Sequence, residues 1–373
     1  KVGDITVRAP SVDVRTIGAG GGSIAFVPEL TRALRVGPDS AGADPGPAAY
    51  MKGGDKATVC DANVVLGYLP SDVKLGGAMN INREAATAAV QTLADAMDID
   101  LMAAAEGIIK IVNESMLGAL RLVSVEQGYD PRDFALVGFG GAGPLHANAL
   151  GVLSGSWPVI VPPGPGVLCA YGDATTQIQD EASRTYVTSV EAISAEDLVS
   201  ELEGLCARAS QSFITDGIGE EQHEVSYQAD FRYAGQAFQL SLPVTIERLR
   251  SEGLSVLTDE FDRQHEQLFT FALGMDHEIV MIRAVVKAES SLSADLSQVS
   301  EGATDLKAAA IHDTKVYVDQ KWHDAVVYDR SKLGIDAVVI GPAIVVEMDS
   351  TTLILADHAA TVDKVGNLLI NPV

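Results

Sequence analysis

A glycine-rich stretch near the start of the sequence has the composition of an anion-binding turn. It reads Thr16-Ile-Gly-Ala-Gly-Gly-Gly-Ser-Ile-Ala25, with apolar or β-branched residues on both sides. This order predicts a strand, a tight turn and a second strand. Glycine lets a ligand approach the main chain closely, and consecutive N–H groups in such a turn form a concavity for an anion. A glycine-rich hairpin that binds no ligand has the same pattern. The candidate phosphate-binding residues are Gly18, Gly20, Gly21, Gly22 and Ser23, whose hydroxyl could contact a phosphate or its metal.

A second glycine turn follows about 120 residues later. Residues 134–139 are a short apolar run that predicts a buried strand, and residues 146–153 predict a helix. A strand, a glycine turn and a helix N-terminus together are typical of phosphate or nucleoside binding. His146 lies in the first helical turn, as a reactive group or as a hydrogen-bonding residue of the helix end. The candidate nucleotide-binding residues here are Gly140, Gly141, Gly143 and Pro144.

Aspartates are frequent in the intervening stretch, residues 28–80, which is also rich in Gly and Pro. Asp39, Asp44 and Asp61 could hold a divalent cation through oxygen ligands. Asp-Pro and Pro-Asp pairs also make turns without any ligand, and we favour that interpretation for each aspartate taken singly.

Composition limits the class of protein. The 373 residues are 47% hydrophobic and 21% charged, which is typical of a globular chain of two or three domains. The net charge of −25 argues against binding to nucleic acid or to anionic membranes. We see neither a signal peptide nor an apolar run long enough to span a bilayer. Three widely spaced cysteines favour a reduced, cytoplasmic protein over a disulfide framework.

The elements that must position the two turns are predicted by hydrophobic periodicity. The first part of the chain carries helices at 83–97 and 101–125 between the turns. From about Gly172 the glycine motifs stop, and we expect helices at 196–214 and 254–271, a hairpin at 225–244 and a strand at 279–286. Residues 290–305 have the composition of a linker, and short strands follow. The predicted domains are 1–172, an α+β domain at 173–292 and a small β-rich module at 293–373.

Two glycine turns separated by helices resemble the actin-like ATPase architecture. In that superfamily, Gly18 to Ser23 would correspond to the phosphate-2 turn and Gly140 to Pro144 to the adenosine turn. The fold class implied for residues 1–172 is therefore an α/β, actin-like ATPase (ribonuclease H-like) lobe.

Several local strings more specifically resemble the A-type component of the hydantoinase/5-oxoprolinase family. The resemblance spans essentially the whole chain and is strongest in residues 12–172. The strings that carry it are Thr16–Ala25, Gly42-Ala-Asp-Pro-Gly-Pro47, Gly128-Tyr-Asp-Pro-Arg132, Phe139-Gly-Gly-Ala-Gly-Pro-Leu-His-Ala147 and Gly341-Pro-Ala-Ile344.

This resemblance implies ATP-dependent opening of a cyclic amide such as hydantoin, 5-oxoproline or a lactam, by phosphorylation of its carbonyl oxygen. A sister branch implies the alternative of ATP-dependent carboxylation of a ketone such as acetone or acetophenone. The implied cofactors are ATP and Mg²⁺ (or Mn²⁺), and the implied partner is a B-type subunit in a hetero-oligomer.

Two departures from the family pattern affect these expectations. The phosphate-1 turn of the family's N-terminal lobe is absent, so we expect another segment or chain to supply that lobe. A non-catalytic scaffold subunit is a second interpretation of the same absence. Arg15 stands where relatives often carry His, and Asp13 is the nearest acid to the first turn. We expect Asp13 and Arg15 at the reactive centre with His146, and Asp13 or Asp44 on the metal.

Overall fold

The computed structural model describes residues 12–72, 74–288 and 306–373. It divides into two compact units, one formed by Lys1–Tyr171 with Asp295–Val373 and the other by Gly172–Ala294. The linker predicted at 290–305 lies outside the described residues.

Long helices of the first unit begin at side-chain caps. In α2 (Arg83–Met97), the Asn82 side chain accepts a hydrogen bond from the Ala85 N–H, and in α3 (Leu101–Val123) Asp100 accepts from two N–H groups of the first turn. Such caps satisfy N–H groups that have no partner inside the helix. The helices predicted at 83–97 and 101–125 are thereby confirmed, the second ending at Val123. The other helices of this part of the chain are α1 (Val59–Val65), α4 (Gly143–Ser154), α5 (Leu168–Thr175) and α9 (Leu306–Ala309).

Strands of the first unit form two main sheets. The five-stranded sheet has the order β11 (Val338–Ile340), β14 (His358–Val362), β15 (Leu368–Pro372), β4 (Val159–Val161) and β3 (Leu136–Val137). The four-stranded sheet has the order β13 (Thr351–Ile354), β12 (Ala343–Val346), β10 (Lys321–Asp329) and β9 (Ala310–Val318). The short strands predicted for the last part of the chain are confirmed.

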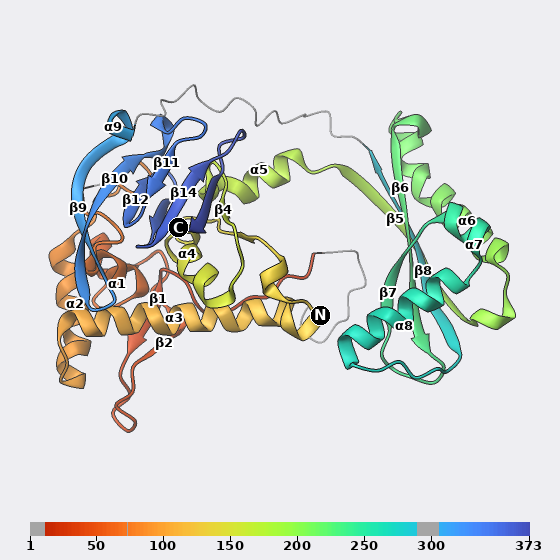
Figure 1. The fold of residues 1–373 in the computed structure, drawn as a ribbon, viewed down its shortest axis with the longest axis horizontal. Coiled ribbons are helices and arrows are strands. Elements are labelled where there is room, and N and C mark those ends of the chain that lie inside the picture. Colours follow the sequence, from red (N-terminus) through yellow and green to blue (C-terminus); the bar gives the residue numbers. More distant parts are fainter. Residues whose placement is uncertain (1–11, 73, 289–305) are drawn as a thin grey trace. The chain divides into compact units, whose positions relative to one another are not determined.

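The C-terminal strands complete a sheet begun by earlier residues. β15 pairs antiparallel with β4, and Leu369 lies opposite Ile160. In Figure 1 the blue C-terminal strands accordingly lie beside the yellow-green β4. The β-rich C-terminal segment therefore shares a sheet with the residues that follow the second glycine turn.

Two hydrophobic clusters support this unit. One joins α1, α2 and α3 to the four-stranded sheet, with Ile108 and Val327 fully buried. The other lies between the sheets and includes Val161, Ile354 and Ile370. Burial of this kind contributes about 1.5–3 kcal/mol for each large aliphatic side chain.

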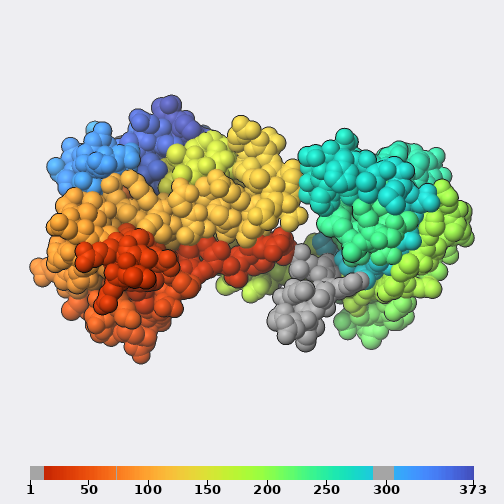
Figure 2. Space-filling model, turned by 90° about the horizontal axis from the view of Figure 1, so that it is seen from below, coloured from red at the N-terminus to blue at the C-terminus, as the bar shows by residue number. Residues whose placement is uncertain are grey.

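The first glycine turn precedes a two-stranded hairpin, β1 (Ser23–Phe26) and β2 (Arg35–Ser40). The strand predicted before the turn is not formed: residues 12–17 are irregular, and Val12 and Val14 are exposed. A strand needs a hydrogen-bonding neighbour, and β1 pairs only with β2 in the described sheets. In the space-filling view, the red N-terminal stretch lies on the surface beneath the gold residues of α3 (Figure 2).

The second unit is a four-stranded antiparallel sheet packed with helices. Its strand order is β5 (Ile178–Ser189), β8 (His277–Ala288), β6 (His223–Tyr233) and β7 (Leu240–Val244). The helices are α6 (Ala195–Thr215), α7 (Ile246–Glu252) and α8 (Ser255–Phe269). Leu202, Phe231 and Phe261 are buried in its core. The predicted helices, hairpin and strand of this region are confirmed.

None of the described helices combines the length and the apolar character that crossing a membrane requires.

Candidate functional site

Ser23 closes the first glycine turn through its own hydroxyl. Its Oγ accepts a hydrogen bond from the Gly20 N–H at 2.9 Å and donates to the Gly18 carbonyl at 3.3 Å. The Ser23 N–H donates to the Gly20 carbonyl at 3.0 Å, and the side chain is buried. The hydroxyl expected to contact a phosphate or metal is therefore engaged in holding the turn.

Neighbouring segments fix the rest of this turn. The carbonyl of Gly21 accepts from the Cys60 N–H and that of Gly22 from the Ala41 N–H, both at 2.8 Å. A Cβ on Gly18 would lie 2.8 Å from the Cβ of Pro38, so a side chain there would displace β2. At Gly20, by contrast, a Cβ would meet nothing within 4 Å. The turn is thus packed on one side and open where a ligand could approach.

The second turn connects β3 to α4, in the order that the sequence predicts, but the strand covers only Leu136–Val137 and is not buried as expected. Gly140 has a φ of +87°, a conformation that favours glycine, and its N–H donates to the Pro165 carbonyl at 2.7 Å. Helix α4 begins at Gly143, and its N-cap residue, Ala142, has no side-chain hydrogen bond to the first turn. Pro144, which has no N–H, occupies the first turn and is buried. The N-terminal end of α4 therefore keeps a positive dipole end without a capping side chain.

The two glycine turns lie against each other. An ideal Cβ on Gly21 would lie 3.7 Å from the Cβ of Ala142, and a Cβ on Gly143 would meet nothing within 4 Å. Within the described residues, the N–H groups of Gly21, Gly22, Gly141 and Ala142 donate no hydrogen bond. The structure thus brings together two sets of main-chain donors that are about 120 residues apart in sequence.

His146 lies in the interior, away from solvent. Its Nδ1 is 2.8 Å from Oδ1 of Asn113 on α3, and only 2% of the residue is exposed. Burial lowers the pKa of His146 to about 4, so the ring is neutral near pH 7. The neutral ring donates through Nδ1 to the amide oxygen. This placement favours a role in joining α4 to α3 over the reactive role expected from the sequence.

Asp13 and Arg15 pair with each other on the exposed segment before the first turn. Oδ1 of Asp13 is 3.1 Å from Nε of Arg15, and each side chain is about half exposed. Asp44 is also exposed. Across the described ranges, no three His, Cys, Asp or Glu side chains are arranged to hold a metal ion. The acids expected as metal ligands therefore form no ligand cluster built from protein groups alone.

Asp61, another acid considered as a cation ligand, has a structural role. Its carboxylate accepts hydrogen bonds from the N–H groups of Ala48, Ala49 and Thr58 and from the Thr58 hydroxyl. Burial raises the pKa of Asp61, and these hydrogen bonds act in the opposite direction. Together Asp61 and Thr58 form a capping box that starts α1.

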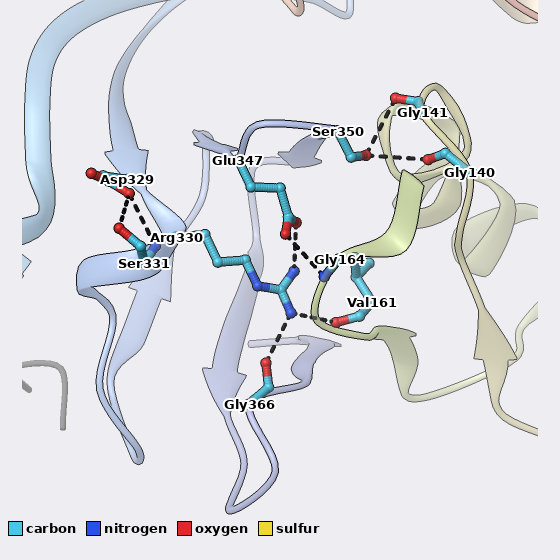
Figure 3. A network of polar contacts seen from close by, with 10 residues as sticks. All are labelled: Gly140, Gly141, Val161, Gly164, Asp329, Arg330, Ser331, Glu347, Ser350 and Gly366. Carbon is cyan, nitrogen blue, oxygen red and sulfur yellow. Dashed lines mark hydrogen bonds and ion pairs between the residues drawn. The ribbon is translucent and has the colours of Figure 1, made fainter. Parts of the chain in front are cut away.

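The sequence did not point to the loop between β12 and β13, which supports the second turn. The Ser350 hydroxyl donates to the carbonyls of Gly140 and Gly141, at 3.2 and 3.3 Å (Figure 3). Nearby, a buried ion pair joins Arg330 to Glu347 at 3.1 Å. The nearest motif in the sequence is the Gly341–Ile344 string, which gives no indication of a contact with the second turn. A hydrophobic pattern cannot relate this loop to a turn 210 residues earlier.

Two protein-family models match the chain. The hydantoinase/oxoprolinase family model matches residues 1–182, and the hydantoinase/oxoprolinase C-terminal domain matches residues 187–369. The chain is 35% identical to caprolactamase subunit alpha of Pseudomonas jessenii, over 98% of this chain and 53% of that one. It is 32% identical to the acetophenone carboxylase gamma subunit of Aromatoleum aromaticum, over 94% of this chain and 49% of that one.

A solved structure has the same fold. The crystal structure of ATP-dependent caprolactamase from Pseudomonas jessenii matches with a TM-score of 0.84 and 33% identity, over 96% of this chain and 53% of that chain. The α/β, actin-like ATPase fold expected from the sequence is confirmed by this match. The chain spans about half the length of the curated relatives it matches. Paired glycine turns, the sequence strings and these matches agree, and the chain belongs to the hydantoinase/oxoprolinase family.

Proposed function

We propose that this chain is part of an enzyme that opens a cyclic amide at the expense of ATP. The observation that carries the proposal is the approach of the two glycine turns, with Gly21 and Ala142 side by side and with N–H groups on both turns that have no acceptor among the described residues. Such donors stabilise phosphate oxygens without a basic side chain. They supply local positive potential in a chain whose net charge is −25.

The nucleotide would lie between Gly18–Ser23 and Gly140–Pro144, with phosphates toward the first turn and adenosine toward the second. Phosphoryl transfer to the amide oxygen would turn that oxygen into a leaving group and overcome the resonance of the amide. The relative with 35% identity is named for a lactam, and the family name covers hydantoins and oxoproline. A cyclic amide is therefore the substrate class that we propose.

Arg15 is the side chain that we propose for the reacting phosphoryl group, because it adjoins the first turn and carries a permanent positive charge. In the structure it is held by Asp13. Mg²⁺ or Mn²⁺ commonly binds through one or two carboxylates, water and phosphate oxygens. Asp13 or Asp44 would contact such an ion only together with a nucleotide, which agrees with the lack of a metal cluster among the described side chains.

The proposed enzyme also requires partner chains. Two relatives are named as subunits, alpha and gamma, of larger enzymes. We propose that a lobe carrying the phosphate-1 turn and a B-type subunit act with this chain. We also propose a cytoplasmic location, which its three free cysteines favour.

The proposal is tested with the complete complex, isolated with whichever chains co-purify. Caprolactam, hydantoin, 5-oxoproline and acetone with bicarbonate are supplied in turn, and ADP and organic product are measured together. We expect ADP release coupled to ring opening of one cyclic amide, and a loss of at least tenfold in kcat for Arg15→Ala. Full activity of Arg15→Ala would show that Arg15 takes no part in the reaction, but it would not contradict the proposed reaction class.

A ketone carboxylase is the second candidate, because one relative at 32% identity is an acetophenone carboxylase subunit. In the same assay, ADP release that requires both ketone and bicarbonate, with every cyclic amide left intact, would establish this alternative. If none of these substrates stimulates ADP release, the assay supports neither the hydrolase nor the carboxylase.

A further inference from the structure

Ser350 occupies a fixed position behind the second glycine turn. It is 3% exposed, and its main-chain carbonyl accepts a hydrogen bond from the Glu347 N–H at 3.0 Å, which closes the loop between β12 and β13. Its hydroxyl points at the carbonyls of Gly140 and Gly141, as Figure 3 shows. One hydroxyl proton is thus shared between two successive carbonyl oxygens of the turn.

The orientation of these carbonyls determines where two N–H groups point. Neither peptide bond is among the cis bonds of the chain, so each carbonyl points opposite to the N–H of the same peptide plane. By holding the carbonyls of Gly140 and Gly141, Ser350 directs the N–H groups of Gly141 and Ala142 away from itself. Neither N–H has an acceptor in the described part of the chain. Successive N–H groups held in this way form an anion-binding concavity.

The loop that carries Ser350 is anchored by contacts other than the Ser350 hydroxyl. Arg330 forms a buried ion pair with Glu347, and its guanidinium donates to the Val161 and Gly366 carbonyls, both at 2.8 Å. Glu347 also accepts from the Gly164 N–H at 3.2 Å. The adjacent Pro165 carbonyl accepts from the Gly140 N–H. The segment after β4 therefore holds both the turn and the loop, so the Ser350 hydroxyl can be removed without releasing either main chain.

We propose that Ser350 is a positioning residue for nucleotide: it fixes the carbonyls of the second turn so that the Gly141 and Ala142 N–H groups face the ligand. This inference rests on the nucleotide site of the proposed function. It adds that a residue in the loop between β12 and β13 controls the nucleotide affinity of a turn more than 200 residues away in sequence.

The test compares two buried serines in the complete complex. Ser350→Ala removes the hydroxyl behind the turn, while Ser156→Ala removes a hydroxyl that donates to the Pro131 carbonyl at 2.8 Å. Ser156 lies beyond the C-terminal end of α4, a helix about 18 Å long, so its loss leaves the turn untouched. KM for ATP, kcat, the Kd of a non-hydrolysable ATP analogue and the thermal unfolding midpoint are measured for each variant.

We expect the KM for ATP and the Kd of the analogue to rise about tenfold in Ser350→Ala with kcat nearly unchanged, and neither to rise in Ser156→Ala. Ser350→Thr, which keeps a hydroxyl, should restore most of the affinity. If Thr does not fit, Ser350→Cys, a weak donor, should give an intermediate KM. Equal KM values for Ser350→Ala and the wild type would overturn the inference and leave the proposed function intact. If the wild-type complex neither binds nor uses ATP, the proposed function fails and this inference fails with it.

Discussion

Gly21 and Ala142 are neighbours where the two glycine turns lie against each other: an ideal Cβ on Gly21 would lie 3.7 Å from the Cβ of Ala142, which is van der Waals contact. Gly21 does not have a positive φ, so its backbone accepts a side chain without strain. A bulky residue at this position would therefore place its side chain between the two turns without first distorting the backbone of the turn.

Gly21→Val should weaken nucleotide binding by at least tenfold, because its methyl groups would occupy the approach to the main-chain donors. The Kd of an ATP analogue is measured by calorimetry with the complete complex. Gly118→Val is the matched control, since Gly118 lies on an exposed part of α3 and a Cβ there meets nothing within 4 Å. Unchanged affinity in Gly21→Val would show that the site has been assigned to the wrong residues.

Arg330→Ala should destabilise the first unit by about 3–5 kcal/mol, because it leaves the Glu347 carboxylate buried without its partner. The two side chains are only 9% and 14% exposed. Arg132→Ala is the control: its ion pair with Asp130 lies in solvent, so its loss should change the free energy of unfolding far less than the loss of Arg330. Urea unfolding measures both. Arg330→Met combined with Glu347→Gln should recover part of the loss, and equal effects of Arg330→Ala and Arg132→Ala would contradict this account.

Asp61→Ala should lower the free energy of unfolding by about 2–4 kcal/mol, because three buried main-chain N–H groups lose their acceptor. Asp39→Ala, which removes an exposed acid from the same stretch, should change it by less than about 0.5 kcal/mol. Thermal unfolding is followed with EDTA and with excess Mg²⁺. A structural role requires the same loss in both; a loss seen only with Mg²⁺ would make Asp61 a metal ligand.

His146 should make stability depend on pH below 7. Its pKa is about 4 when folded and about 6.5 when unfolded, so the unfolded chain binds more protons between these values. The contribution of the neutral ring is therefore complete above about pH 6.5 and is lost as the pH falls toward 4, with about 2 kcal/mol lost by pH 5. The free energy of unfolding of the wild type and of His146→Gln is compared at pH 7 and pH 5. If both lose the same amount, the ring is not buried as described.

Local sequence signals predicted the elements of this fold well. Helix α2 occupies the predicted residues because its apolar periodicity and its Asn82 cap are both encoded within a few positions. The strand expected around Val12 and Val14 did not form because strands depend on a neighbour, which a local pattern does not supply. The sequence thus predicted whether a segment forms a helix or a strand, but it did not predict which strands pair with each other.

The same distinction applies to the candidate site. Both glycine turns could be found from composition, and so could the helix that follows Gly140. The contact of His146 with Asn113 could not, since Asn113 lies 33 positions away on another helix. Ser350 was missed for the same reason, because its two acceptors are more than 200 residues distant.

The pairing of β5 with β8 gives the second unit the form of a domain insertion. In sequence, the second unit (Gly172–Ala294) lies between the two parts of the first, and within it Ile178 lies opposite Ala288 on adjacent strands. The boundary between the two family matches, at 182–187, falls inside β5. A cut there would split two sheets at once, because β15 would also be separated from β4. Exchange of the second unit in evolution, or its removal by engineering, should therefore cut the chain just before β5 and just after β8 rather than near the middle of the sequence.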